Sequence, residues 1–121
     1  MPAEYGKQDL VQMLTELCPE LGQLPKNKKK RAKALAEVKT KIFLCTPIPA
    51  FKSTWNINDS VIVNGVIPIQ QEVAKEYGLQ VIDLHTLFGN DSNMMVADGI
   101  HPNERGARRM AEIIADALKK E

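Results

Sequence analysis

Asp98 and His101 are the residues of this sequence whose types and spacing suggest acid–base chemistry. They stand three positions apart in the stretch ADGIHPNERG, just ahead of a helix expected to begin at Pro102 or Asn103. A carboxylate can hold one ring nitrogen of a histidine and fix its tautomer, which leaves the other nitrogen to accept a proton from a hydroxyl. The same spacing also suits an ordinary turn before a helix, with no chemistry attached. From the residues alone, both interpretations stay open.

Few other side chains offer a nucleophile or a metal site. The serines are Ser53, Ser60 and Ser92, and residues 1–40 contain none. Ser60 and Ser92 each follow an Asn-Asp pair, which is better explained by a helix cap beginning at Asn58 and by a turn after Gly89. His85 is expected to brace a loop. With two histidines and no carboxylates in ligand spacing, the sequence predicts no metal and no cofactor.

The composition is that of one soluble globular domain. The chain has 121 residues, 44% of them hydrophobic and 26% charged, with a formal net charge of +1. This balance predicts no general attraction to nucleic acid. No apolar run reaches membrane-spanning length and no signal-peptide core is visible, so a cytoplasmic protein that does not bind membranes is expected. Cys18 and Cys45 are expected to be small buried side chains without a disulfide.

A basic segment, Lys26–Lys41, departs from this balance. It holds eight of the sixteen basic residues and one acid, Glu37. Such a cluster could bind phosphates or an acidic partner. However, no aromatic residue lies among the lysines, and the apolar positions recur at helical spacing. An ordinary helix with a solvated face is therefore the favoured interpretation.

The remaining pattern predicts an α/β chain. Apolar spacing indicates helices over Lys7–Leu21 and Val61–Tyr77, and short apolar runs indicate buried strands at Ile42–Thr46 and Leu79–Leu84. Pro68 must either kink the second helix or lie in a first helical turn. A strand, a helix and a strand in this order form a right-handed parallel crossover. Two strands make an incomplete sheet, because parallel strands are normally buried inside a larger one.

Three stretches of the sequence resemble the C-terminal half of SGNH, or GDSL-type, hydrolases. They are KIFLCTPIPAF, NGVIPIQQEVAKEYGLQVIDLHTLF and DGIHPNERGARRMAEIIADAL. The resemblance is greatest to the acylhydrolase or acetylesterase branch found in bacteria that degrade complex glycans. It implies a three-layer α/β/α, flavodoxin-like fold, with 41–121 as the C-terminal half of the domain and 1–40 as a divergent helical segment. It also assigns Asp98 and His101 as the acid and base of a Ser–His–Asp triad.

The sequence departs from the family pattern in its other blocks. It contains no Gly-Asp-Ser nucleophile block and no Gly-x-Asn-Asp oxyanion block. The resemblance therefore implies a truncated carboxyl-ester hydrolase that is inactive alone, with a small acyl ester or an acetylated sugar as its substrate. One alternative completes the site and the sheet in trans, by homo-oligomerisation or by a partner chain bound at the open edge of Ile42–Thr46. The other is a small non-catalytic interaction module that uses the basic helix.

Overall fold

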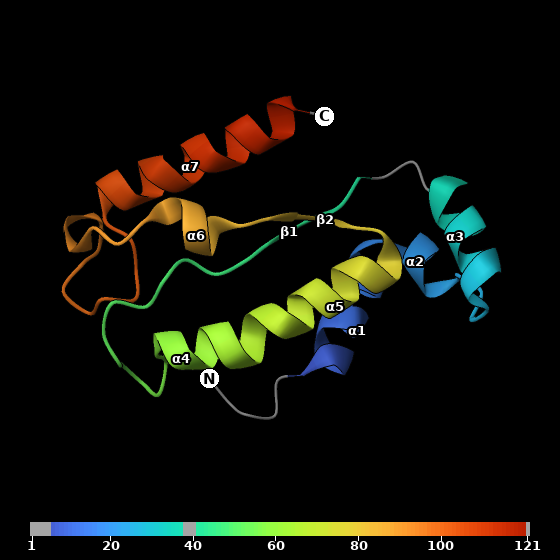
Figure 1. Cartoon of the computed structure of the whole chain (residues 1–121), viewed down its shortest axis with the longest axis horizontal. Coiled ribbons are helices and arrows are strands. Elements are labelled where there is room, and N and C mark those ends of the chain that lie inside the picture. Colours follow the sequence, from blue (N-terminus) through green and yellow to red (C-terminus); the bar gives the residue numbers. More distant parts are fainter. Residues whose placement is uncertain (1–5, 38–40, 121) are drawn as a thin grey trace. The chain divides into compact units, whose positions relative to one another are not determined.

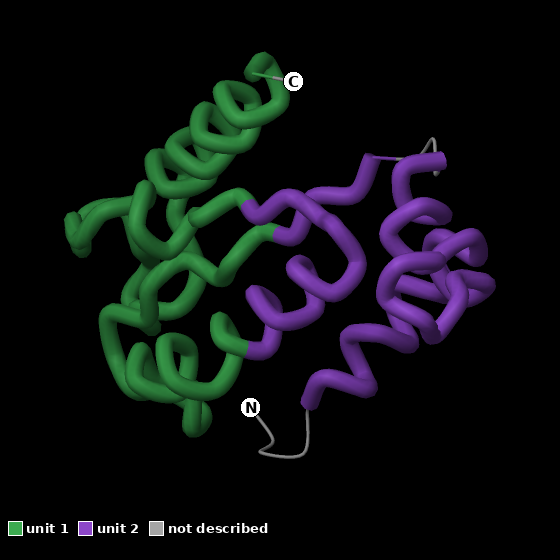
Figure 2. The backbone as a smooth tube through the Cα atoms, turned by 45° about the vertical axis from the view of Figure 1, so that its right-hand side comes forward, with its two compact units in different colours: residues 1, 45–68, 82–121 green, residues 2–44, 69–81 purple. Residues whose placement is uncertain are grey.

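The computed structural model describes residues 6–37 and 41–120 as two compact units (Figure 2). Within these residues, one unit consists of Cys45–Pro68 and the chain from Ile82 onward. The other consists of the chain up to Leu44 together with Ile69–Val81. The predicted division into 1–40 and 41–121 concerns the origin of the segments rather than their packing, so it stays a prediction.

The N-terminal helices belong to the second unit. They are α1 (Lys7–Leu17), α2 (Pro19–Gly22) and α3 (Lys28–Glu37). The prediction of one helix over Lys7–Leu21 is wrong, because Pro19 has no backbone N–H to donate and instead opens α2 at its first position. The basic helix is confirmed as α3, and the Asn27 side chain accepts hydrogen bonds from the first-turn N–H groups of Lys29 and Lys30. Residues 38–40 of the basic segment lie outside the described part.

A strand–helix–strand crossover follows, as the sequence predicts (Figure 1). Strands β1 (Phe43–Cys45) and β2 (Gln80–Ile82) form a parallel two-stranded sheet within the described residues. Three helical segments connect them: α4 (Asp59–Val61), the π-helix η1 (Ile62–Val66) and α5 (Ile67–Tyr77). Pro68 lies in the first turn of α5, where its missing donor is tolerated, and the π turn directly precedes it.

The segment after β2 differs from the prediction. The strand was expected to reach Leu84, but β2 ends at Ile82 and helix α6 (Leu84–Phe88) begins at once. The Asp83 side chain causes this early ending, because its carboxylate accepts from the backbone N–H of Thr86 and caps the new helix. A 3-10 helix, η2 (Ser92–Met94), and the long helix α7 (Glu104–Lys119) complete the chain.

Each unit buries its own set of apolar side chains. In the second unit the core is Leu14, Cys18, Leu21, Leu44, Val73 and Ala74. In the first unit the buried hydrophobic residues include Ile62, Ile82, Leu84, Phe88, Met95 and Ile113. The prediction of buried cysteines is confirmed for Cys18, whereas Cys45 is only partly buried, and neither forms a disulfide. The class is therefore α/β, built on a small parallel sheet. No described helix is both long and apolar enough to cross a bilayer.

Candidate active site

The side chains of Asp98 and His101 are in direct contact. One carboxylate oxygen of Asp98, Oδ2, lies 2.6 Å from the Nδ1 atom of His101. The other, Oδ1, accepts hydrogen bonds from the backbone N–H groups of Ile100, at 2.8 Å, and of His101, at 2.9 Å. Asp98 thus both closes the turn and holds the imidazole ring. The turn and the carboxylate–histidine contact, which were alternative interpretations of the sequence, are therefore both present. The helix cap belongs to a different residue, Asn103, whose side chain accepts from the N–H of Gly106.

The contact sets the charge of Asp98 and the tautomer of His101. The hydrogen bond from the His101 side chain, helped by the two backbone N–H groups, lowers the pKa of the Asp98 carboxyl to about 2. An ionised carboxylate can only accept hydrogen bonds, so in the neutral imidazole Nδ1 carries the proton and Nε2 carries the lone pair. Among the described residues nothing hydrogen-bonds to Nε2, and the His101 side chain is 66% exposed. Nε2 is therefore ready to accept a proton from an approaching hydroxyl.

The lowered pKa predicts an acid-dependent contribution of Asp98 to stability. The folded-state pKa lies below the ordinary value of 3.8, so the unfolded chain binds more protons between about pH 4 and pH 2. The stabilisation is complete above that window and is lost as the pH falls through it. Chemical unfolding of wild type and of Asp98→Asn from pH 6 to pH 2 should show the gap between them closing toward pH 2. A constant gap would contradict the prediction.

The loop that follows β1 positions the Asp98–His101 pair, called the dyad below, through contacts with residues 97–101, the dyad loop. The backbone N–H of Phe51 donates to the carbonyl of Gly99 at 2.8 Å, and the Thr54 hydroxyl donates to the carbonyl of Asp98 at 2.8 Å. The ammonium group of Lys52 donates to the carbonyl of Ala97 at 2.9 Å. Three successive carbonyls of the dyad loop are thereby fixed from one neighbouring segment.

Gly99 permits this close approach. Its φ is +72°, and a Cβ there would lie 2.8 Å from the Cβ and 2.9 Å from the backbone nitrogen of Lys52. We expect Gly99→Ala to lower the free energy of unfolding by about 3 kcal/mol, because backbone strain and overpacking add. Denaturant titration measures the loss.

Gly78 provides a matched control for that substitution. It has a similar φ, +67°, but a Cβ there would meet the Leu35 side chain at an ordinary 3.6 Å. Gly78→Ala should therefore carry the backbone strain alone, about 1–2 kcal/mol. An equal loss in both variants would show that the clash with Lys52 is unimportant.

Trp55 lies beside the dyad, a proximity that the sequence did not reveal. Its ring centroid is 6.1 Å from that of His101, with an angle of 67° between the ring planes. Thr54 and Ile57 exchange both backbone hydrogen bonds, and Trp55 and Asn56 between them have φ values of 53° and 63°. This geometry is a type I′ turn. The sequence signal was no more than a lone tryptophan in a polar loop.

A second histidine–carboxylate pair lies in the same unit. His85 Nε2 is 2.8 Å from Asp59 Oδ1, which also accepts from the backbone N–H of Ala50. The backbone N–H of His85 donates to the hydroxyl of buried Thr46. The predicted bracing role of His85 agrees with these contacts, and the predicted helix cap at Asn58 is confirmed by its bond from the N–H of Val61. The pair borders a cavity of about 490 Å³.

The serines of the chain do not complete a triad in the described structure. No hydrogen bond joins a serine hydroxyl to His101 within the described residues. The Ser60 hydroxyl instead accepts from the side-chain amide of Asn64 at 3.2 Å. Ser92 begins the 3-10 helix η2. Likewise, no three His, Cys, Asp or Glu side chains of the described part converge as metal ligands would.

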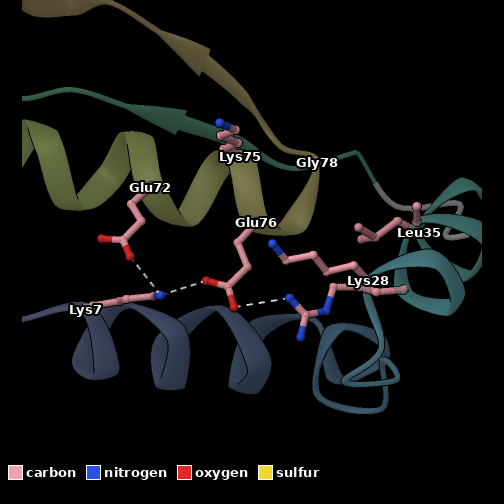
Figure 3. Close-up of a pocket in the computed structure, with 9 residues that line it drawn as sticks. Lys7, Lys28, Leu35, Glu72, Lys75, Glu76 and Gly78 are labelled. Atoms are coloured by element: carbon pink, nitrogen blue, oxygen red, sulfur yellow. Dashed lines mark hydrogen bonds and ion pairs between the residues drawn. The ribbon is translucent and has the colours of Figure 1, made fainter.

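The basic helix is partly neutralised within its own unit. Arg31 of α3 pairs with Glu76 of α5 at 3.2 Å, and Lys7 bridges Glu72 at 3.1 Å and Glu76 at 2.8 Å (Figure 3). The Lys7 bond is the main reason that the pKa of Glu76 is lowered. These side chains border a cavity of about 650 Å³, which Lys28 also lines. The use of α3 to bind an acidic partner stays a prediction.

Comparison with known proteins places this chain in a hydrolase family. Residues 3–114 match the family of GDSL-like lipases and acylhydrolases. The chain therefore belongs to that family, and the match includes residues ahead of Lys41, where the resemblance seen in the sequence begins. It is also 62% identical over 120 residues to an acetylxylan esterase of Xylanibacter ruminicola. That alignment covers 96% of this chain and 25% of the esterase, so the chain spans about a quarter of its relative's length. No solved structure matches it significantly.

Proposed function

We propose that this chain supplies the acid–base pair of a serine esterase that removes acyl or acetyl groups from acetylated sugars. The observation that carries the proposal is the 2.6 Å contact between the Asp98 carboxylate and Nδ1 of an exposed His101. Membership of the GDSL-like family supports ester hydrolysis, and the similarity to an acetylxylan esterase supports an acetylated polysaccharide as the substrate class.

The proposed roles follow from the charge and tautomer of the pair. As a serine oxygen attacks the acyl carbon, Nε2 of His101 takes the hydroxyl proton, and Asp98 stabilises the resulting imidazolium. The imidazolium then returns this proton to the departing sugar oxygen, which leaves an acyl-serine. In the second half of the reaction, Nε2 takes a proton from a water molecule that attacks the acyl carbon. The imidazolium then passes this proton to the serine oxygen as the carboxylic acid leaves. Each half thus begins and ends with a neutral imidazole.

The proposed nucleophile comes from polypeptide outside this sequence. The family's serine and oxyanion blocks are absent from the 121 residues, and Ser60 is engaged with Asn64. We propose that those blocks belong to the rest of a three-layer α/β/α fold, in which the two strands seen here are part of a larger parallel sheet. In the described residues β1 pairs with β2, and its other edge suits a further strand. A partner chain or an exchanged segment of an oligomer could supply that strand.

The chain alone is expected to lack esterase activity, because no serine is hydrogen-bonded to His101 in the described structure. Purified chain should release no acetate from acetylated xylan above the rate of a heat-treated sample. A fluorophosphonate probe, which marks activated serines, should leave it unlabelled. Acetate release that is abolished by His101→Ala in the chain alone would overturn the proposed external serine.

A chimera tests the proposed function itself. This chain would replace the matching 120 residues of the Xylanibacter ruminicola acetylxylan esterase, with the rest of that protein unchanged. The 62% identity favours correct folding of the chimera. We expect the chimera to release acetate from acetylated xylan, and we expect this activity to depend on His101. A folded chimera without activity, or one indifferent to His101, would refute the assignment.

A further inference from the structure

We propose that Trp55 is a stacking platform for the sugar ring that carries the ester, placed beside the base of the reaction. This inference rests on the proposed function and extends it, because it assigns sugar recognition to a residue outside the acid–base pair. Three observations support it: the exposure of Trp55, its ring contact with His101 and the turn that holds it.

Trp55 is exposed in a way that folding does not require. It is the single tryptophan of the chain, and 66% of its surface is accessible. A tryptophan that stabilises a core is largely covered, whereas this one keeps most of its indole in solvent. Its described ring contact is with His101, at a centroid separation of 6.1 Å. A group stacked on the indole would therefore lie within reach of the imidazole.

The backbone presents Trp55 at a conformational cost. Trp55 and Asn56 both adopt positive φ, and such conformations for non-glycine residues cluster where ligands are held. A glycine at position 55 would relieve the strain at that position. The Thr54 hydroxyl binds the carbonyl of Asp98 at 2.8 Å, so the turn that carries Trp55 is fixed to the dyad loop. The platform and the base are thus held as one assembly.

The surroundings of Trp55 favour a sugar ring over an acyl chain. Lys52, Ser53 and Asn56, which flank it in the sequence, are all exposed and can form hydrogen bonds. A pyranose presents C–H groups on one face, which suit the negative face of the indole, and hydroxyl groups around its edge. A long acyl chain would instead need an apolar channel.

Binding can be measured without any hydrolysis. Because Trp55 is the single tryptophan, the fluorescence of the unmodified chain reports on this residue alone. Titration with xylohexaose should give a saturable change in this fluorescence. Isothermal titration calorimetry, which needs no tryptophan, should show heat of binding that Trp55→Phe weakens and Trp55→Ala removes. Circular dichroism checks that the variants fold. A response to methyl hexanoate but not to xylohexaose would overturn the proposal, as would a change that follows protein concentration alone.

Kinetics of the chimera separate this inference from the proposed function. Trp55→Ala should raise the KM for acetylated xylan about fivefold, and it should raise the KM for p-nitrophenyl acetate, which has no sugar ring, by a smaller factor. Leu118→Ala, which truncates another exposed side chain, should change neither. An active chimera whose KM ignores Trp55→Ala refutes the platform alone. An inactive chimera whose parent chain still binds xylohexaose through Trp55 refutes the esterase assignment alone.

Discussion

His101→Ala in the chimera is expected to lower kcat for acetylated xylan by about a millionfold, the loss that follows removal of a triad base. Without the imidazole, nothing in the described site can take the serine proton while the acyl carbon is attacked. The exposed ring makes few packing contacts, so the fold should survive the change. Acetate release under saturating substrate measures the effect.

His85→Gln is the matched control for that experiment, because it removes the other histidine of the sequence. The His85 ring binds Asp59, and its loss should lower thermal stability while the folded fraction keeps most of its activity. If the two histidine variants lose activity equally, His101 acts through stability rather than as a base. A loss below about tenfold for His101→Ala would also contradict the general-base role, which by itself supplies at least 100-fold.

Asp98→Asn in the same chimera is expected to lower kcat by about 10,000-fold, with a smaller effect on KM. The amide oxygen of asparagine can still accept from the backbone N–H groups of Ile100 and His101, so the turn is preserved. Its NH₂ group, however, would donate to Nδ1 and force the ring into the other tautomer. Nε2 would then carry a proton and could not act as a base.

Asp116→Asn is the control for the carboxylate, since Asp116 is an exposed aspartate on α7. It removes the same charge without contacting the dyad, so kcat should stay near that of the parent. Unfolding curves at pH 7 should show Asp98→Asn still cooperatively folded. A similar loss of kcat in both aspartate variants would attribute the effect to net charge rather than to the tautomer.

Local sequence signals predicted most elements, and they failed where a single side chain redirected the backbone. The parallel crossover, the basic helix and the cap at Asn58 all appear in the structure. Pro19 broke the first predicted helix because it lacks a donor, and Asp83 ended a predicted strand because its carboxylate caps a helix. Both signals are visible in the sequence, and each is a single side chain that overrides the apolar periodicity around it.

The sequence by itself determined the contact between Asp98 and His101. Their separation of three residues, with Gly99 between them at positive φ, lets one carboxylate reach both the backbone and the ring of a single turn. Such an interaction is local, so it can be anticipated from spacing. The family resemblance led to the same pair.

The tertiary structure alone decided what surrounds that pair. Trp55 meets His101 across 46 positions of chain, and Asp59 meets His85 across 26. No periodicity links residues so far apart, because their approach depends on how the loop after β1 folds back onto the dyad loop. That approach needs Gly99, whose missing Cβ gives Lys52 the room to pass. The acid–base pair is therefore set by local sequence, whereas the residues around it are brought there by tertiary packing.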